Sequence, residues 1–223
     1  MRPEEFAKKM DVTLVRNSNT EREVLEIITA AKKYRFASVF AMQCYLKLLS
    51  SSLEEIQDVN VGGVIGFPSG AELTEIKLFE AKTCIEYGAD ELDMVINLGW
   101  LKSGMFESVE NEIREIKEVC GNRPLKCIIE ISCLEKDEAK KASEIIVKAG
   151  ADYVKTGTGW FEPVTVEDVK LIKEVIGDAA FIKAAGGIRT YEQALALINA
   201  GASRLGVGLK SAVGIIESAT KTK

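Results

Sequence analysis

The stretch that decides the fold is Gly150-Ala151-Asp152-Tyr153-Val154-Lys155-Thr156-Gly157-Thr158-Gly159. Its first glycine closes a helical pattern, because glycine just past a helix adopts the left-handed cap conformation, and an apolar strand follows at once. The same phrase returns as Gly88-Ala89-Asp90 and, with serine in third place, as Gly201-Ala202-Ser203. Helix ends that lead directly into strands, repeated along the chain, predict alternating helices and strands.

Helix starts are marked equally well. Thr165-Val166-Glu167-Asp168 and Thr190-Tyr191-Glu192-Gln193 resemble capping boxes, in which side chains satisfy the free N–H groups of a first turn. Strands are predicted near residues 11–15, 36–41, 61–66, 91–97, 125–131, 152–155, 180–183 and 203–206. Helices are predicted near residues 20–34, 43–50, 71–87, 104–120, 135–149, 165–176, 190–200 and 209–219.

Eight βα units in 223 residues fit an α/β fold, a small (β/α)8 TIM barrel that forms a single domain over residues 1–223. The predicted strand Leu125-Lys126-Cys127-Ile128-Ile129 is mostly apolar, as expected for a parallel sheet covered by helices. No linker rich in proline, serine and glycine interrupts the chain. A doubly wound open sheet is the competing architecture.

The composition argues against nucleic acid and membranes as partners. The net charge of −5 comes from interspersed acidic and basic residues and offers no basic stripe for nucleic acid. No apolar run approaches the roughly 20 residues of a membrane span, and the N-terminal residues lack the apolar core of a signal peptide. The five cysteines are an odd number without a CxxC pair, which favours reduced thiols in a cytoplasmic protein.

The chain contains no histidine. This excludes serine or cysteine triads built on histidine, zinc sites with histidine ligands, and histidine acid–base catalysis. Proton transfer must therefore use aspartate, glutamate, lysine, tyrosine or water.

Charged side chains occur in strands that should be apolar. Lys155 and Lys183 each end a predicted strand, while Asp93 and Lys126 lie inside two others. The carboxyl ends of barrel strands form the functional face, so we expect all four near one mouth. A buried amine beside a second cation has a lowered pKa and can attack carbonyl groups, which indicates imine chemistry. The alternative is structural: Asp93 and Lys126 form a buried ion pair, and the other two lysines reach toward solvent.

Glycines after the last two predicted strands indicate a phosphate site. Gly186 and Gly187 follow the seventh strand, and Gly206 and Gly208 lead into the last helix. Loops at these places, with exposed amides at a helix N-terminus, commonly hold phosphate in this barrel. Two tight turns that need positive φ angles would explain the same glycines.

The chain resembles the deoxyribose-phosphate aldolase family, the class I aldolases that join acetaldehyde to glyceraldehyde 3-phosphate. The similarity runs from about Asp11 to Ile216. It is densest in four ordered strings: Val64-Ile65-Gly66-Phe67-Pro68, Gly88-Ala89-Asp90-Glu91-Leu92-Asp93-Met94-Val95-Ile96-Asn97, Lys155-Thr156-Gly157-Thr158-Gly159, and Lys183-Ala184-Ala185-Gly186-Gly187-Ile188-Arg189-Thr190.

The resemblance implies a role for each matching residue. Lys155 corresponds to the Schiff-base lysine, and Lys183 to the second lysine that lowers its pKa. Asp93 corresponds to the carboxylate that moves protons with a water molecule, and Lys126 to the inner lysine that orders this network. Gly186 and Gly187 correspond to the phosphate loop. The iminium serves as the electron sink, so the resemblance implies no cofactor and no metal.

Three places depart from the family pattern. Phe40-Ala41-Met42-Gln43 stands where Cys-Val-Asn-Pro is frequent, and Gly157 stands where serine is usual, although we still expect it to contact substrate. Gly208 and Leu209 stand where serines usually begin the last helix. Lost hydroxyl groups would remove hydrogen bonds to the phosphate. The resemblance therefore supports the imine chemistry better than it supports a particular substrate.

The leading hypothesis is reversible cleavage of 2-deoxy-D-ribose 5-phosphate. A same-family aldolase with another aldehyde acceptor is the first alternative, suggested by Met42, Gly157 and Leu209. Lys210 or Arg189 could replace the lost attraction for phosphate. A non-catalytic sugar-phosphate-binding barrel is the second alternative. Barrel helices can face solvent or a partner, so a monomer and a homo-oligomer, dimer or tetramer, both remain open.

Overall fold

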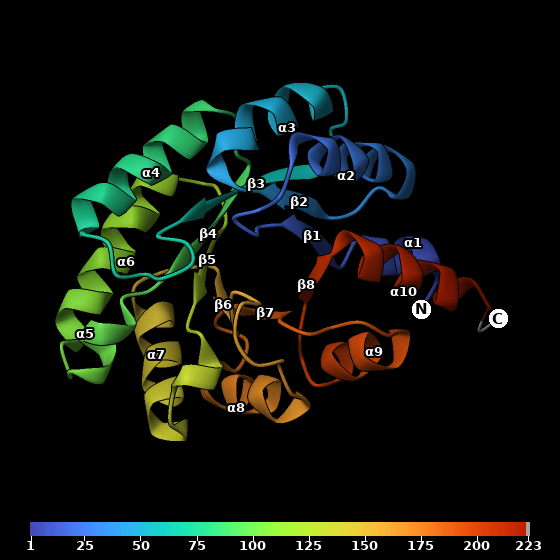
Figure 1. Ribbon diagram of the computed structural model, residues 1–223. Coiled ribbons are helices and arrows are strands. Elements are labelled where there is room, and N and C mark those ends of the chain that lie inside the picture. The colour runs from blue at the N-terminus through green and yellow to red at the C-terminus, as the bar shows by residue number, and fades with distance from the viewer. Residues whose placement is uncertain (222–223) are drawn as a thin grey trace.

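The computed structural model describes residues 1–221 and confirms the predicted (β/α)8 barrel. Eight parallel strands follow one another around the barrel in chain order, and β8 (Arg204–Gly208) pairs with β1 (Met10–Leu14) to close it. Helices enclose the strands on the outside (Figure 1). The open doubly wound sheet is therefore wrong. Residues 222 and 223 of the predicted domain lie outside the described residues.

The remaining strands are β2 (Ser38–Ala41), β3 (Asn60–Ile65), β4 (Glu91–Val95), β5 (Leu125–Ile128), β6 (Tyr153–Lys155) and β7 (Phe181–Ala185). The helices are α1 (Pro3–Ala7), α2 (Glu21–Tyr34), α3 (Leu46–Leu53), α4 (Thr74–Glu86), α5 (Leu98–Lys102), α6 (Phe106–Cys120), α7 (Lys136–Lys148), α8 (Val166–Ile176), α9 (Tyr191–Asn199) and α10 (Leu209–Lys221). Two short 3₁₀ helices, Gln43–Tyr45 and Ile131–Cys133, follow β2 and β5.

The predicted helix starts are confirmed at atomic detail. The Thr165 side chain accepts a hydrogen bond from the Asp168 amide at 3.1 Å, and the Thr165 amide donates one to Asp168 Oδ2 at 2.8 Å. Thr190 and Gln193 form the same reciprocal pair at the start of α9. These caps satisfy backbone N–H groups that have no partner within the helix.

Two helices escaped prediction, and the ends of two strands, β5 and β7, were wrong. Helices α1 and α5 have five residues each, too few for an apolar helical period to be seen. β7 runs on to Ala185, so Lys183 lies in the middle of its strand and does not end it. The predicted strand 125–131 stops at Ile128 because Glu130 takes a left-handed backbone conformation, with φ at +44°.

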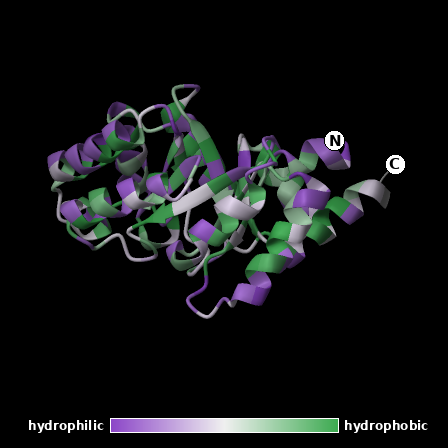
Figure 2. Ribbon diagram, turned by 90° about the horizontal axis from the view of Figure 1, so that it is seen from above, coloured by the Kyte–Doolittle hydropathy of each residue, from purple (hydrophilic) through white to green (hydrophobic). Residues whose placement is uncertain are grey.

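Apolar side chains fill the layer between strands and helices, as Val24, Ile27 and Ala31 of α2 do. Seen from above, the outer helices are a mosaic of hydrophilic and hydrophobic residues (Figure 2). Along residues 1–221, every helix is too short or too polar to cross a lipid bilayer. The inside of the barrel differs from the outer layer, because buried charged side chains occupy it. These are Asp11, Glu91, Asp93, Lys126 and Lys183.

Candidate active site

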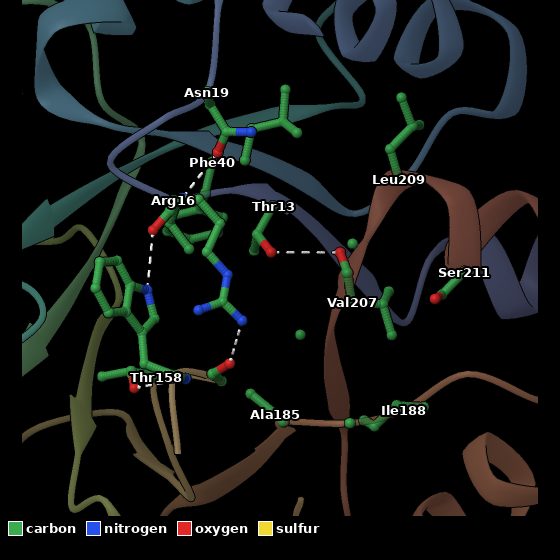
Figure 3. Close-up of a pocket in the computed structure, with 18 of the residues that line it drawn as sticks. Thr13, Arg16, Asn19, Phe40, Thr158, Ala185, Ile188, Val207, Leu209 and Ser211 are labelled. Atoms are coloured by element: carbon green, nitrogen blue, oxygen red, sulfur yellow. Dashed lines mark hydrogen bonds between the residues drawn. The ribbon is translucent and has the colours of Figure 1, made fainter. Parts of the chain in front are cut away.

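The carboxyl ends of the strands surround a cavity of about 580 Å³ (Figure 3). Lys155 and Asp93 lie in its wall, and the loops after β1, β3, β6 and β7, together with the start of α10, complete it. Lys183 and Lys126 do not line the cavity; they are buried in the barrel beneath it. Catalytic groups are expected at this end of such a barrel.

Strand register brings the predicted catalytic residues together. Lys155 on β6 is paired in register with Lys183 on β7, and Asp93 on β4 with Lys126 on β5. Residues paired in this way point to the same face of the sheet, here the barrel interior. Lys155 Nζ donates to Asp93 Oδ2 at 2.6 Å, and Lys183 Nζ donates to the same oxygen at 2.7 Å. The two nitrogens therefore share one carboxylate oxygen.

Lys126 has a different principal partner from the one predicted. Its Nζ lies 3.0 Å from Glu91 Oε1 and 3.4 Å from Asp93 Oδ1, so Glu91 is the nearer carboxylate. These contacts are electrostatic, because the Lys126 ammonium has no well-directed hydrogen-bond partner among the described residues. The simple Asp93–Lys126 ion pair considered as a structural alternative is part of a larger network.

Sequence reasoning missed three members of that network. Asp11 accepts Lys183 at 2.6 Å and Arg204 at 2.6 Å, and Arg204 also reaches Glu91 at 3.3 Å. Glu91 could have been found, because strand residues two apart share a face and Glu91 stands two before Asp93. Asp11 and Arg204 carry no such signal, since their approach depends on the closure between β1 and β8.

The charges of this cluster favour a neutral Lys155. Three carboxylates face four basic side chains: Asp11, Glu91 and Asp93 against Lys126, Lys155, Lys183 and Arg204. With Lys155 as an amine the formal charges cancel, whereas an ammonium leaves one uncompensated positive charge in the barrel. An unbalanced buried charge is costly, so Lys155, which contacts a single carboxylate, is the member that most readily loses its proton.

The pKa values follow from burial and from these contacts. The pKa of Lys155 is lowered to about 8, because burial and the Lys183 ammonium together outweigh the opposing Asp93 carboxylate. Burial by itself would raise the pKa of Asp93, but the ammonium groups of Lys155, Lys183 and Lys126 hold it below its ordinary value. For Lys126, the nearby carboxylates outweigh burial and raise its pKa. A fraction of Lys155 is therefore a neutral amine near neutral pH, while Asp93 stays ionised.

Four of the five predicted phosphate-loop glycines line the cavity: Gly186, Gly187, Gly206 and Gly208. Gly186 and Gly187 have φ angles of +113° and +69°, which other residues rarely adopt. A Cβ atom on Gly187 would lie 2.5 Å from Pro163, so this position also lacks space for a side chain. The glycines therefore serve the turn and leave backbone groups accessible in the cavity.

Gly157 does not line the cavity, which differs from its predicted contact with substrate. A Cβ atom there would lie 2.6 Å from Glu130 Oε1, because Gly157 packs against that carboxylate. Met42 also lies outside the lining, whereas Leu209 is part of it. Of the departures that suggested another acceptor, Leu209 is thus the one that touches the cavity.

Glu130 is a further residue that the sequence did not reveal. It is buried, and its Oε2 accepts hydrogen bonds from the Thr158 amide at 2.9 Å and the Thr158 hydroxyl at 2.5 Å. Thr158 lines the cavity, so Glu130 fixes the loop that follows Lys155. The left-handed backbone of Glu130 is unfavourable for a residue with a side chain, which is typical of functional sites.

Two aromatic residues, Trp160 and Phe67, form one side of the mouth. Both line the cavity, and their rings meet edge to face with centroids 6.2 Å apart. Trp160 Nε1 donates to the carbonyl of Val15 in the loop after β1, at 3.0 Å. Three loops therefore meet at Trp160.

All five cysteines are free, and Cys84, Cys120 and Cys127 are buried. Within residues 1–221, no cluster of three or more acidic or cysteine side chains is arranged to hold a metal ion. The predicted independence from metals and cofactors stays a prediction.

Comparison with known proteins identifies what the chain is similar to. Residues 6–213 match the model of a family described as DeoC/LacD family aldolase. Deoxyribose-phosphate aldolase of Finegoldia magna is 46% identical, over 96% of this chain and 99% of that relative. The enzyme of that name from Thermococcus kodakarensis is also 46% identical, over 98% of this chain and 99% of its own length.

Solved structures agree with this similarity. An aldolase called QR15 superposes with a TM-score of 0.91 at 36% identity and covers 97% of this chain and 96% of that one. The deoxyribose phosphate aldolase of Aeropyrum pernix, described as a tetramer, gives a TM-score of 0.90 at 31% identity, with 99% and 93% coverage.

Proposed function

The chain belongs to the DeoC/LacD family of aldolases, and we propose that it reversibly cleaves 2-deoxy-D-ribose 5-phosphate to D-glyceraldehyde 3-phosphate and acetaldehyde through a Schiff base. Membership of this family makes it a lyase. The observation that carries the proposal is Lys155, a buried lysine in the cavity wall whose pKa is lowered to about 8.

Lys155 is the nucleophile in this reaction. Its neutral amine attacks the aldehyde carbon of the open-chain sugar, and loss of water from the carbinolamine leaves an iminium. The Lys183 ammonium lies beside the shared oxygen of Asp93 and opposes reprotonation of Lys155. Lys126, Asp11, Glu91 and Arg204 keep these groups in place from beneath.

Asp93 transfers protons in concert with a water molecule. Removal of the proton from the sugar 3-hydroxyl breaks the bond between C2 and C3, and the electrons pass into the iminium to form an enamine. Glyceraldehyde 3-phosphate leaves, the enamine is protonated at C2, and hydrolysis releases acetaldehyde and neutral Lys155. Asp93 is the carboxylate in direct contact with Lys155, which supports this assignment.

The phosphate occupies the part of the cavity formed by Gly186, Gly187 and the start of α10. Positive φ angles at both glycines and the helix N-terminus support an anion site there. Gly206 and Gly208 line the same region. A second candidate is the same chemistry on an unphosphorylated acceptor, because Leu209 presents an apolar side chain to this cavity.

Two measurements test the proposal. Incubation with acetaldehyde and borohydride should reduce the imine and leave a stable adduct on Lys155, located by mass spectrometry; an unlabelled Lys155 would falsify the imine mechanism. Cleavage of phosphorylated and unphosphorylated deoxyribose should then be compared. Equal values of kcat/KM would contradict the phosphate site and favour the second candidate.

We also propose that the chain forms a homo-oligomer through the outer face of α4. Leu73, Ile76 and Phe79 project from this helix or its N-cap and are strongly exposed, with Leu73 at 66% and Phe79 at 68%. A second copy of the chain would cover these side chains, and the Aeropyrum pernix relative is described as a tetramer. Light scattering should give a mass above 24.4 kDa, and Phe79→Glu should lower it. A monomer would exclude this interface.

The proposed location is the cytoplasm, where thiols stay reduced. Five free cysteines, two of them exposed, support this assignment.

A further inference from the structure

We propose that Arg16 is a specificity residue of this site, whose guanidinium binds the substrate phosphate in place of the serine hydroxyls absent at Gly208 and Leu209. This inference rests on the proposed function, because it names the cation that selects a phosphorylated substrate. Arg16 belongs to the loop between β1 and α2, and its side chain points into the cavity (Figure 3).

Contacts between two loops hold the Arg16 side chain in the cavity. Its Nη2 donates to the carbonyl oxygen of Gly159 at 2.9 Å, and its guanidinium lies 5.3 Å from the centre of the Trp160 ring. Trp160 in turn donates to Val15, the neighbour of Arg16. Few of the side chain's rotamers are left to lose on binding, so this arginine is prepositioned for an anion.

The residue that holds Arg16 also touches the phosphate loop. A Cβ atom built on Gly159 would lie 3.8 Å from the Cα atom of Gly186. Gly159 is therefore adjacent to the turn formed by Gly186 and Gly187, and its carbonyl oxygen holds the Arg16 guanidinium. Because Arg16, Gly186 and Gly187 line the same cavity, we expect the guanidinium to exchange the Gly159 carbonyl for a phosphate bound on this turn.

Most of the guanidinium's donors are available. Arginine has five N–H donors, and one of those of Arg16 is bonded to Gly159; the others have no hydrogen-bond partner among the described residues. The planar fork matches two phosphate oxygens, and a charged acceptor is preferred over a neutral carbonyl. Arg189 and Lys210 also line the cavity, but no contact recorded for residues 1–221 fixes either side chain.

The acidic groups at the same mouth have other partners. Glu23 accepts the amide and the hydroxyl of Thr20, and Glu26 lies 3.6 Å from Arg22. Neither carboxylate forms an ion pair with Arg16 within the part of the chain that the structure describes. These two carboxylates therefore do not neutralise the Arg16 guanidinium, which is available to bind an anionic ligand.

Arg16→Met tests this assignment, with Arg22→Met as the matched control, because Arg22 is an exposed arginine of α2 outside the cavity lining. Arg16→Met should raise KM for deoxyribose 5-phosphate by about 10- to 100-fold, the worth of one charge-assisted hydrogen bond, with a much smaller change in kcat. For unphosphorylated deoxyribose the change in KM should be less than about threefold. Equal losses on both substrates, or no loss on either, would overturn the proposal.

Fluorescence of Trp160 gives a readout that does not need catalysis. The chain has two tryptophans, and Trp100→Phe leaves Trp160 as the reporter beside Arg16. Inorganic phosphate should change this fluorescence saturably as Arg16 exchanges partners, and Arg16→Met should weaken the apparent affinity by about tenfold or more. Phosphate binding that is equally tight in Arg16→Met would refute the assignment.

The two proposals can fail separately. If borohydride does not label Lys155 but phosphate binding depends on Arg16, the aldolase mechanism fails and the phosphate assignment holds. If Lys155 is labelled and phosphate binding is unchanged in Arg16→Met, the aldolase mechanism holds and the phosphate assignment of Arg16 fails.

Discussion

Replacing Lys183 with methionine should raise the pKa of Lys155 and suppress activity at neutral pH. Lys183 Nζ and Lys155 Nζ lie 2.7 and 2.6 Å from the same oxygen of Asp93. Methionine fills a similar volume without a charge, so the substitution removes the repulsion between the two ammonium groups. The substitution also removes the ion pair between Lys183 and Asp11. The Asp11 carboxylate, with less of its charge compensated, then stabilises the protonated form of Lys155.

The expected size follows from the geometry. Two nitrogens on one oxygen are roughly 4–5 Å apart, where like charges repel by about 3–4 kcal/mol at an effective dielectric constant near 20. This corresponds to about 2 pKa units, enough to carry the pKa of Lys155 from about 8 most of the way to its ordinary 10.5. At pH 7 the fraction of neutral amine would fall from about one in ten to about one in a thousand, so kcat/KM should fall about 100-fold.

The assay is the pH dependence of kcat/KM for deoxyribose 5-phosphate, together with the rate of borohydride trapping by acetaldehyde. Lys77→Met is the matched control, because Lys77 is equally buried but pairs with Glu112 at 2.9 Å between α4 and α6. Both variants should lose about 3–5 kcal/mol of unfolding free energy, since each leaves a buried carboxylate short of its partner. Only Lys183→Met should move the kinetic pKa. An inflection still near pH 8 in Lys183→Met would refute the reasoning.

Three further predictions concern the same site. In the unmodified protein, kcat/KM should rise about tenfold per pH unit up to about pH 8 and then level off, because the neutral form of Lys155 reacts; a flat profile from pH 6 to 8 would contradict this. Glu130→Ala and Glu130→Gly should both lower kcat/KM about tenfold, because each releases Thr158. Urea unfolding should show that the glycine variant is about 1 kcal/mol more stable than the alanine variant, since glycine tolerates a φ angle of +44°. Equal stabilities of the two variants would exclude backbone strain at this position. Leu209→Ser should lower KM for deoxyribose 5-phosphate about tenfold by adding a hydroxyl donor, and an unchanged KM would separate Leu209 from the phosphate.

Local patterns were sufficient for the architecture. The glycines just past α4, α7 and α9 and the threonine caps before α8 and α9 are encoded within a few residues, and the structure confirms them. Local patterns were insufficient for short elements such as α5, which Asn97 caps by accepting a hydrogen bond from the Trp100 amide. Five residues contain too little periodic signal to stand out.

The four candidate catalytic residues stand out in the sequence because each breaks a local rule. A charge inside an otherwise apolar strand is anomalous wherever that strand sits, which marks Asp93 and Lys126, and a lysine next to a glycine-rich turn marks Lys155 and Lys183. Gly157 shows the limit of this reasoning. Its place in a recognisable string suggested contact with substrate, but the side to which its backbone turns is set by packing against Glu130.

The sequence by itself determined the order of strands and helices, the closed barrel they can form, and the lysines that make imine chemistry reasonable. Only the tertiary structure decided which charges neutralise one another, because Asp11 meets Lys183 and Arg204 across the seam where β1 joins β8. It also decided that Arg16 reaches Gly159, 143 residues away. Local propensities act over a few residues, whereas the balance of charge at Lys155 depends on groups that chain closure alone brings within a few ångströms.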